Sequence, residues 1–117
     1  MTDSTLRTKS KLLAKEIVLL CRKLKQNNVE SALINQLLRA GTSIGANIHE
    51  AQYAQGTKDF ISKLEIALKE CNETNYWLEL LFETYSLSQL DFETFQKLCI
   101  ELRRMLVSSI TTLKSKL

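Results

Sequence analysis

The chain has 117 residues, of which 44% are hydrophobic, and its formal net charge is +3 at pH 7. This length suits one domain with a real core, and the absence of proline together with only three glycines favours long helices joined by short turns. No apolar run reaches the roughly 20 residues of a membrane span and the first residues are polar, so we expect a soluble cytoplasmic protein without a membrane partner.

The first predicted helix covers residues 4–26 and is strongly basic. Its apolar side chains recur at four-three-four spacing, which is typical of the seam of an antiparallel bundle: Leu13, Ile17, Leu20 and Leu24. The other faces carry seven basic side chains, and the acidic ones in this region are Asp3 and Glu16. Such a helix can lie on a membrane surface, but a solvated bundle helix is favoured because lysine stems routinely cover the sides of such helices.

The second predicted helix, residues 31–53, has a clear core-facing side. Its apolar stripe recurs every three or four residues: Leu33, Leu37, Ala40, Ile44, Ile48 and Ala51. Two asparagines interrupt the pattern before it, and Asn28 or Ser31 can cap the helix. Gly41 and Gly45 stand one turn apart. Because glycine within a helix costs about 1 kcal/mol relative to alanine, we expect another backbone to approach closely there.

Polar side chains line the edge of this stripe, and we name them the polar ribbon: Arg39, Ser43, Asn47 and Glu50. Their spacing of four, four and three residues places them on one side of the helix. Such groups need partners if they are buried, so we favour a hydrogen-bonded seam against the third helix or a neighbouring subunit. Lys58 and Tyr53 are the partners expected for Glu50. The alternative is that the ribbon is a binding site.

A break precedes the third predicted helix, which covers residues 57–85. Gly56 is expected to take the left-handed backbone conformation that ends a helix, and Thr57 is expected to cap the next one. The long apolar face that follows forms a helical hairpin with the second helix: Phe60, Leu64, Ala67, Cys71, Leu78, Phe82 and Tyr85.

The fourth predicted helix, residues 89–114, starts after Ser88, which resembles a capping box with Asp91 three residues later. One apolar stripe runs along it: Phe92, Phe95, Cys99, Leu102, Leu106 and Leu113. A second apolar group is spread around its axis: Leu98, Ile100, Met105, Val107 and Ile110. A helix with so much apolar surface is buried on more than one side. The sequence therefore predicts a homo-oligomer in which another subunit covers this surface.

Three segments of the chain resemble a known protein family. They read Gln36-Leu37-x-Arg39-Ala40-x-x-Ser43-Ile44-x-x-Asn47-Ile48-x-Glu50, Lys58-Asp59-Phe60-Ile61-x-x-Leu64-x-Ile66-Ala67 and Glu73-x-x-Tyr76-Trp77-Leu78. They resemble the four-helix-bundle proteins encoded in bacterial 23S rRNA intervening sequences, to which the accessory proteins of diversity-generating retroelements are similar. One departure is Ala51, where many members carry glycine. The resemblance implies an antiparallel up-down-up-down four-helix bundle that assembles into a closed ring of five, with no established catalytic activity and with a nucleic-acid role.

No segment carries a strong catalytic, metal or cofactor signal. His49 and Glu50 begin like a zinc-protease motif, but Tyr53 stands where the second histidine is needed. The three cysteines are widely separated and lie on apolar stripes, so we interpret them as reduced core residues: Cys21, Cys71 and Cys99. We therefore expect no catalytic residue, no metal site and no cofactor, and we do not expect an enzyme.

Charge is distributed unevenly along what we expect to be a single all-α domain over residues 1–117. Residues 1–25 hold seven basic and two acidic side chains, whereas residues 26–86 hold four and eight. In an up-down-up-down bundle the starts of the first and third helices meet the ends of the second and fourth. This arrangement predicts a basic end: Arg7, Lys9, Lys11, Lys58, Lys63, Lys114 and Lys116.

This charge distribution supports two function classes. The first is a non-enzymatic oligomeric bundle protein that associates with RNA or DNA through the basic end. The alternative is a scaffold or adaptor that binds a partner protein through the surface of the oligomer.

Overall fold

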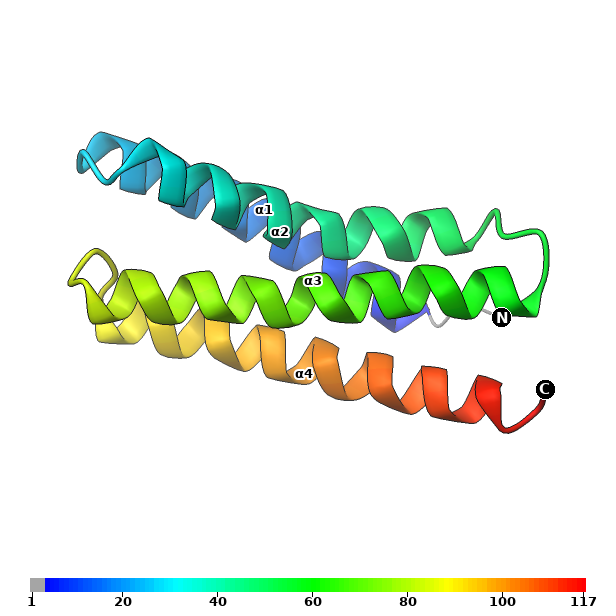
Figure 1. Ribbon diagram of the computed structural model, residues 1–117. Coiled ribbons are helices and arrows are strands. Elements are labelled where there is room, and N and C mark those ends of the chain that lie inside the picture. Colours follow the sequence, from blue (N-terminus) through cyan, green and yellow to red (C-terminus); the bar gives the residue numbers. More distant parts are fainter. Residues whose placement is uncertain (1–3) are drawn as a thin grey trace.

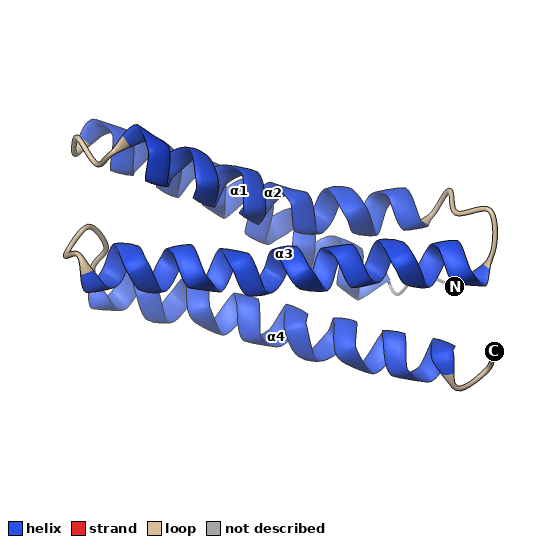
Figure 2. Ribbon diagram, in the orientation of Figure 1, coloured by secondary structure: helices blue, strands red, loops and turns tan. Residues whose placement is uncertain are grey.

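Four antiparallel helices pack side by side in the computed structural model, which describes residues 4–117 (Figure 1). The helices are α1 (Ser4–Gln26), α2 (Ser31–Ala51), α3 (Thr57–Glu83) and α4 (Gln89–Lys114). Helices, turns and loops account for this whole range (Figure 2). None of the helices within it is long and apolar enough to cross a membrane. The predicted all-α, up-down-up-down four-helix bundle is thus confirmed.

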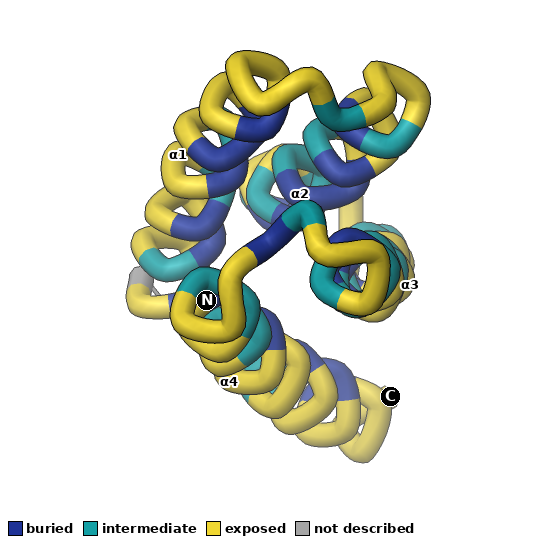
Figure 3. The backbone as a smooth tube through the Cα atoms, turned by 90° about the vertical axis from the view of Figure 1, so that its left-hand side faces the viewer, coloured by how far each residue is buried: buried dark blue, intermediate teal, exposed yellow. Residues whose placement is uncertain are grey.

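Helices that follow one another in the chain lie next to each other, and α4 returns to α1 (Figures 1 and 3). Two ion pairs join the first helix to the last: Lys9 Nζ lies 2.6 Å from Glu101 Oε1, and Lys23 Nζ lies 3.0 Å from Asp91 Oδ2. These pairs place α1 along the first half of α4. The start of α1 and the end of α4 lie at the same end of the bundle as the α2–α3 connection (Figure 1).

Buried positions lie on one face of each helix (Figure 3), and their mostly aliphatic side chains form the core. The largest fully buried side chains come from all four helices: Leu6, Leu13, Ile17, Leu24, Leu37, Ile44, Ile48, Leu64, Leu78, Leu81, Leu102 and Leu106. All three cysteines are buried and free, as the sequence predicts. Because these faces recur with the helical period, each helix presents its polar side to solvent.

Both glycines of α2 lie against α1, where they allow close packing. A Cβ atom on Gly41 would lie 2.8 Å from Cγ2 of the fully buried Ile17. A Cβ atom on Gly45 would lie 3.3 Å from the backbone carbonyl oxygen of Ser10. The expected close approach of another backbone is therefore confirmed at Gly45, whereas at Gly41 the neighbour is a side chain.

The left-handed residues that end helices differ from the predicted one. Gly56 has φ 178°, which is extended backbone, so its prediction as a left-handed residue is wrong. Positive φ occurs instead at Asn28 (59°), after α1, and at Tyr85 (65°), after α3. At Tyr85 the N–H bonds to Phe82 O (3.1 Å) and the N–H of Ser86 bonds to a carbonyl five residues back (2.8 Å), which is a Schellman motif.

Two helices also end earlier than predicted. The predicted bounds 31–53 and 57–85 become Ser31–Ala51 and Thr57–Glu83. After α2, the N–H groups of residues 52, 53 and 54 each bond to the carbonyl three residues back. These tighter turns close the helix without a left-handed residue, which removes the need for one at the following glycine.

Of the four residues predicted as N-caps, Ser88 is confirmed. Ser88 caps α4, and its hydroxyl accepts a hydrogen bond from the N–H of Asp91 at 3.1 Å. Ser31 and Thr57 are not caps, because each is already the first residue of its helix. Before α3, Asp59 instead accepts a bond from the backbone N–H of Gln55 (3.1 Å), which ties the connection to the helix start. The Asn28 cap is likewise wrong, since Glu30 occupies the N-cap position of α2.

Candidate functional site

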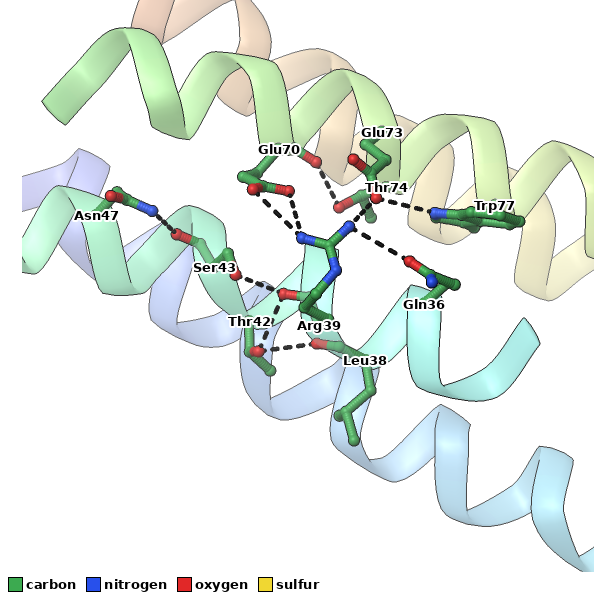
Figure 4. Close-up of polar contacts among 10 residues, drawn as sticks. All are labelled: Gln36, Leu38, Arg39, Thr42, Ser43, Asn47, Glu70, Glu73, Thr74 and Trp77. Carbon is green, nitrogen blue, oxygen red and sulfur yellow. Dashed lines mark hydrogen bonds and ion pairs between the residues drawn. The ribbon is translucent and has the colours of Figure 1, made fainter. Parts of the chain in front are cut away.

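Arg39 links α2 to α3 through two carboxylates (Figure 4). Its Nη1 donates to Glu70 Oε1 at 3.2 Å, and its Nη2 donates to Glu73. The indole N–H of Trp77 donates to the same carboxylate oxygen of Glu73 at 3.2 Å, and Gln36 Oε1 accepts from Arg39 at 3.4 Å. This cluster is a polar seam between α2 and α3 of the kind that the ribbon predicts. Of the ribbon residues, Arg39 is the one that forms it.

The other members of the polar ribbon bond within α2 or lie elsewhere. Ser43 Oγ donates to the carbonyl of Arg39 (2.6 Å), and Asn47 Nδ2 donates to the carbonyl of Ser43 (2.8 Å), as Figure 4 shows. Glu50 is exposed and lies on the side of α2 that faces α1. Tyr53, expected to contact Glu50, packs its ring against His49 with centroids 5.5 Å apart.

The predicted basic end lies where α1 and α3 start and α2 and α4 end (Figure 1). Ion pairs divide its cations. Lys9 pairs with Glu101, and Lys114 Nζ lies 2.8 Å from Glu65 Oε2. The remaining five are in no ion pair with any residue in the range 4–117: Arg7, Lys11, Lys58, Lys63 and Lys116. Two of the seven charges are thus already compensated within the chain.

A groove of about 930 Å³ runs between α1 and α2 on the outside of the bundle. Its floor consists of small side chains where Gly45 lets the helices approach: Ser10, Ala14 and Ala46. Cations from α1 line one rim, and His49 and Glu50 from α2 line the other. The rim cations are Arg7, Lys11 and Lys15.

These rim residues belong to a longer row of cations, which we name the basic stripe of α1: Arg7, Lys11, Lys15, Arg22 and Lys25. At 3.6 residues per turn, all five lie within about 80° of arc around the helix. All are exposed, and none forms an ion pair within the described residues. The other lysines of α1, Lys9 and Lys23, point toward α4 and are paired there.

Sequence reasoning did not single out Lys15, Arg22 or Lys25 as site residues. Their spacing relative to Arg7 and Lys11 was sufficient to find the stripe, because the angular positions follow from the helical period alone.

Comparison with known proteins places the fold in a family. The model of the 23S rRNA-intervening sequence protein family matches residues 2–108. The chain belongs to this family. No curated protein matches it in sequence.

A solved structure supports the assignment to the intervening-sequence protein family. It is a protein of unknown function from the S23 ribosomal protein family of Bacteroides thetaiotaomicron VPI-5482, with a TM-score of 0.88 and 46% sequence identity. The match covers 90% of this chain and 97% of that chain. The two proteins share the same four-helix fold.

The cysteines of this intervening-sequence protein are placed for packing. Burial raises the pKa of Cys21 to about 11. The hydrogen bond between Cys71 and Cys99, together with burial, raises the pKa of Cys99, and the same bond lowers the pKa of Cys71 against the effect of burial. Cys21 and Cys99 thus hold their protons more tightly than a free thiol does, and a protonated thiol is a poor nucleophile and metal ligand. In residues 4–117 no group of three or more His, Cys, Asp or Glu side chains could hold a metal ion.

Proposed function

We propose that the protein is a non-enzymatic, homo-oligomeric helical bundle that binds the phosphate backbone of RNA or DNA through the basic stripe of α1. The observation that carries this proposal is the set of five exposed cations on one side of α1, which have no ion-pair partner within the described residues. A cation without a carboxylate partner can neutralise a phosphate and release its counterion. The proposal moves the contact from the end of the bundle to the side of one helix.

The length of the stripe supports contact with several consecutive phosphates. From Arg7 to Lys25 the helix rises about 27 Å at 1.5 Å per residue. This distance corresponds to about eight phosphates along one strand of B-form DNA, at 3.4 Å each. If five phosphates are neutralised, the logarithm of the binding constant should fall against the logarithm of salt concentration with a slope of about −3.5 to −4.5.

Exposed apolar side chains on α4 support the homo-oligomer, for which we propose a ring of five. Leu90, Ile100 and Val107 are 73%, 40% and 41% exposed. Ile100 and Val107 belong to the second apolar group predicted on this helix. Its other members pack within the chain, since Ile110 is buried and Leu98 and Met105 are partly buried against the core. A ring hides an apolar face without open-ended growth, and it repeats the basic stripe so that weak contacts add through effective concentration.

Light scattering tests the assembly. A ring of five has a mass of about 67 kDa, five times the chain mass of 13.4 kDa. Ile100→Glu with Val107→Glu should release monomers, because each places a charge in the proposed contact. A monomeric wild-type protein at micromolar concentration contradicts the ring.

Fluorescence anisotropy tests the stripe. The triple variant Arg7→Gln, Lys11→Gln, Lys15→Gln is compared with a control of equal charge change at exposed positions elsewhere, Lys69→Gln, Lys97→Gln, Arg104→Gln. Labelled single-stranded RNA and duplex DNA are titrated at low and physiological salt.

The stripe variant should lose much more affinity than the control. The slope of its binding constant against salt should become shallower by the contribution of about three phosphates. Equal losses in the two variants would mean that the contact depends on net charge alone. Negligible binding by wild type at low salt removes the nucleic-acid proposal and favours a scaffold that binds a partner protein.

A further inference from the structure

We infer that the groove between α1 and α2 is a binding site for single-stranded nucleic acid, in which unpaired bases stack at the α2 rim while the phosphates follow α1. This inference rests on the proposed function and adds the class of nucleic acid that the site prefers. The observation behind it is a pair of aromatic side chains beside the groove, which phosphate binding by the basic stripe does not need.

An exposed aromatic pair lies at the end of the groove. His49 lines the groove, and the ring of Tyr53 lies against it with centroids 5.5 Å apart and planes tilted by 59°. Tyr53 is 73% exposed. From α2, Thr42 and His49 also line the groove. Tyr53 lies two residues beyond the end of α2, and its contact with His49 places it beside the groove.

Aromatic rings beside cations are the combination that single strands use. Stacking of a base on an aromatic side chain requires an unpaired base, and it tolerates any sequence because every base has a π-face. In a duplex the bases are already stacked on each other, so an exposed tyrosine on a groove rim adds little. The groove volume of about 930 Å³ lies in the range of ligand-sized clefts.

The charges of the two rims determine which rim the phosphates face and which rim the bases face. Arg7, Lys11 and Lys15 stand on the α1 rim without carboxylate partners among the described residues, whereas Glu50 stands on the α2 rim. A carboxylate repels phosphate and accepts hydrogen bonds from the amino groups of bases. The backbone of a bound strand thus runs along α1, and its bases turn toward Glu50, His49 and Tyr53.

Small floor residues make this approach possible. Gly45 lies so close to the backbone of Ser10 that a Cβ atom would stand 3.3 Å from its carbonyl oxygen. The neighbouring floor positions carry Ala14 and Ala46. Leu12, which is 46% exposed, also lines the groove. Because the side chains near Gly45 are small, bases can reach α2 from a backbone held on α1.

The test compares three labelled ligands of equal length with wild-type protein: a mixed-sequence single strand, an abasic single strand with the same phosphates, and a duplex. The mixed single strand should bind most tightly, because the other two lack unpaired bases. Tyr53→Ala should weaken binding of the mixed strand about 5- to 150-fold, the effect of losing one stacked base. Binding of the abasic strand and the salt slope should stay unchanged, and Tyr53→Phe should restore the affinity.

Tyr76→Ala is the matched control. Tyr76 is also an exposed tyrosine in contact with an aromatic neighbour, Trp77, with ring centroids 5.0 Å apart, but it lies on α3 away from the groove. It should leave all three affinities unchanged. If Tyr53→Ala matches this control, or if duplex and abasic strands bind as tightly as the mixed strand, the inference is overturned. The proposed function then still stands if the Arg7, Lys11, Lys15 variant loses affinity, and it fails if that variant does not.

Discussion

Replacing Arg39 with methionine removes the cation that lies between Glu70 and Glu73 while it keeps a long unbranched stem. The side chains of the three residues are 47%, 14% and 30% exposed, respectively. Exposed ion pairs contribute about 0.2–1 kcal/mol each. The Arg39–Glu70 pair should contribute toward the upper part of that range, because Glu70 is the least exposed of the three side chains. The two carboxylates left behind, one helical turn apart, repel each other by a few tenths of a kcal/mol. We therefore expect a loss of about 1–2 kcal/mol in the free energy of unfolding.

Urea unfolding followed by circular dichroism measures this loss. In a separate thermal unfolding experiment, the melting temperature should fall by about 3–6 °C for each kcal/mol lost in a domain of this size. Lys23→Met is the control, because Lys23 also forms one interhelix ion pair but its side chain is 61% exposed. It should cost less than about 0.5 kcal/mol.

A double-mutant cycle identifies the cause. With Glu73→Gln already in place, Arg39→Met should cost less than it does in the wild-type protein, because the Arg39–Glu73 ion pair is already lost and one of the two repelling charges is gone. Equal losses for Arg39→Met and Lys23→Met, with no coupling to Glu73, would refute the reasoning that this cluster stabilises the packing of α2 on α3.

Three further substitutions test the packing, a buried thiol and a cap. Gly41→Ala gains up to about 1 kcal/mol of helix propensity, but its Cβ would lie 2.8 Å from Ile17 Cγ2, so overpacking of about 1–3 kcal/mol should give a net loss in denaturant unfolding. An unchanged or higher stability contradicts that packing. Burial raises the pKa of Cys21 from 9.0 to about 11, so the folded state keeps a proton that the unfolded chain loses. Stability should therefore fall as pH rises from about 9 to 11, and Cys21→Ala should make this part of the pH profile flatter than in wild type. Ser88→Ala removes the acceptor for the N–H of Asp91 and should cost about 1 kcal/mol, whereas Ser88→Gly should cost only a few tenths.

The helical period predicted the fold because the apolar stripe of each helix indicates which face is buried. Five of the six residues on the predicted core-facing side of α2 are buried, among them Leu37 and Ile44, whereas Leu33 is partly buried. The starts of all four helices also agree with the predicted bounds. Apolar side chains at helical spacing leave few ways to be buried together, so this part of the structure follows from local pattern.

The helix ends could not be predicted equally well, because tertiary packing overrides local preference there. Asparagine tolerates the left-handed region, so Asn28 had a recognisable signal. Tyr85 has none, yet its backbone is left-handed with φ 65°. Two residues later Leu87 is buried in the core, which indicates that packing of the connection favours this conformation. Gly56, the residue with the strongest local signal, is extended.

The candidate site was predicted in part. The positions of the basic residues around α1 follow from the sequence, but their partners do not. The pairing of Lys9 with Glu101 spans 92 residues and depends on where α4 lies against α1. The same applies to Arg39, whose contacts with Glu70 and Glu73 depend on the register of α2 against α3. Charge that is neutralised by distant partners cannot be separated, from sequence alone, from charge that is available to a ligand.

The two ion pairs that join α1 to α4 also bear on the order of folding events. Every other helix contact joins consecutive elements, so it closes only a short connection, whereas Lys9–Glu101 and Lys23–Asp91 join positions 92 and 68 residues apart. Closing a longer loop costs more entropy before any contact compensates for it. The helical hairpins should therefore form before α4 meets α1, and the transition state should lack these two pairs. Substitutions at Lys9 or Lys23 then speed unfolding and leave the folding rate almost unchanged, so the α1–α4 seam is the place where the native bundle begins to open.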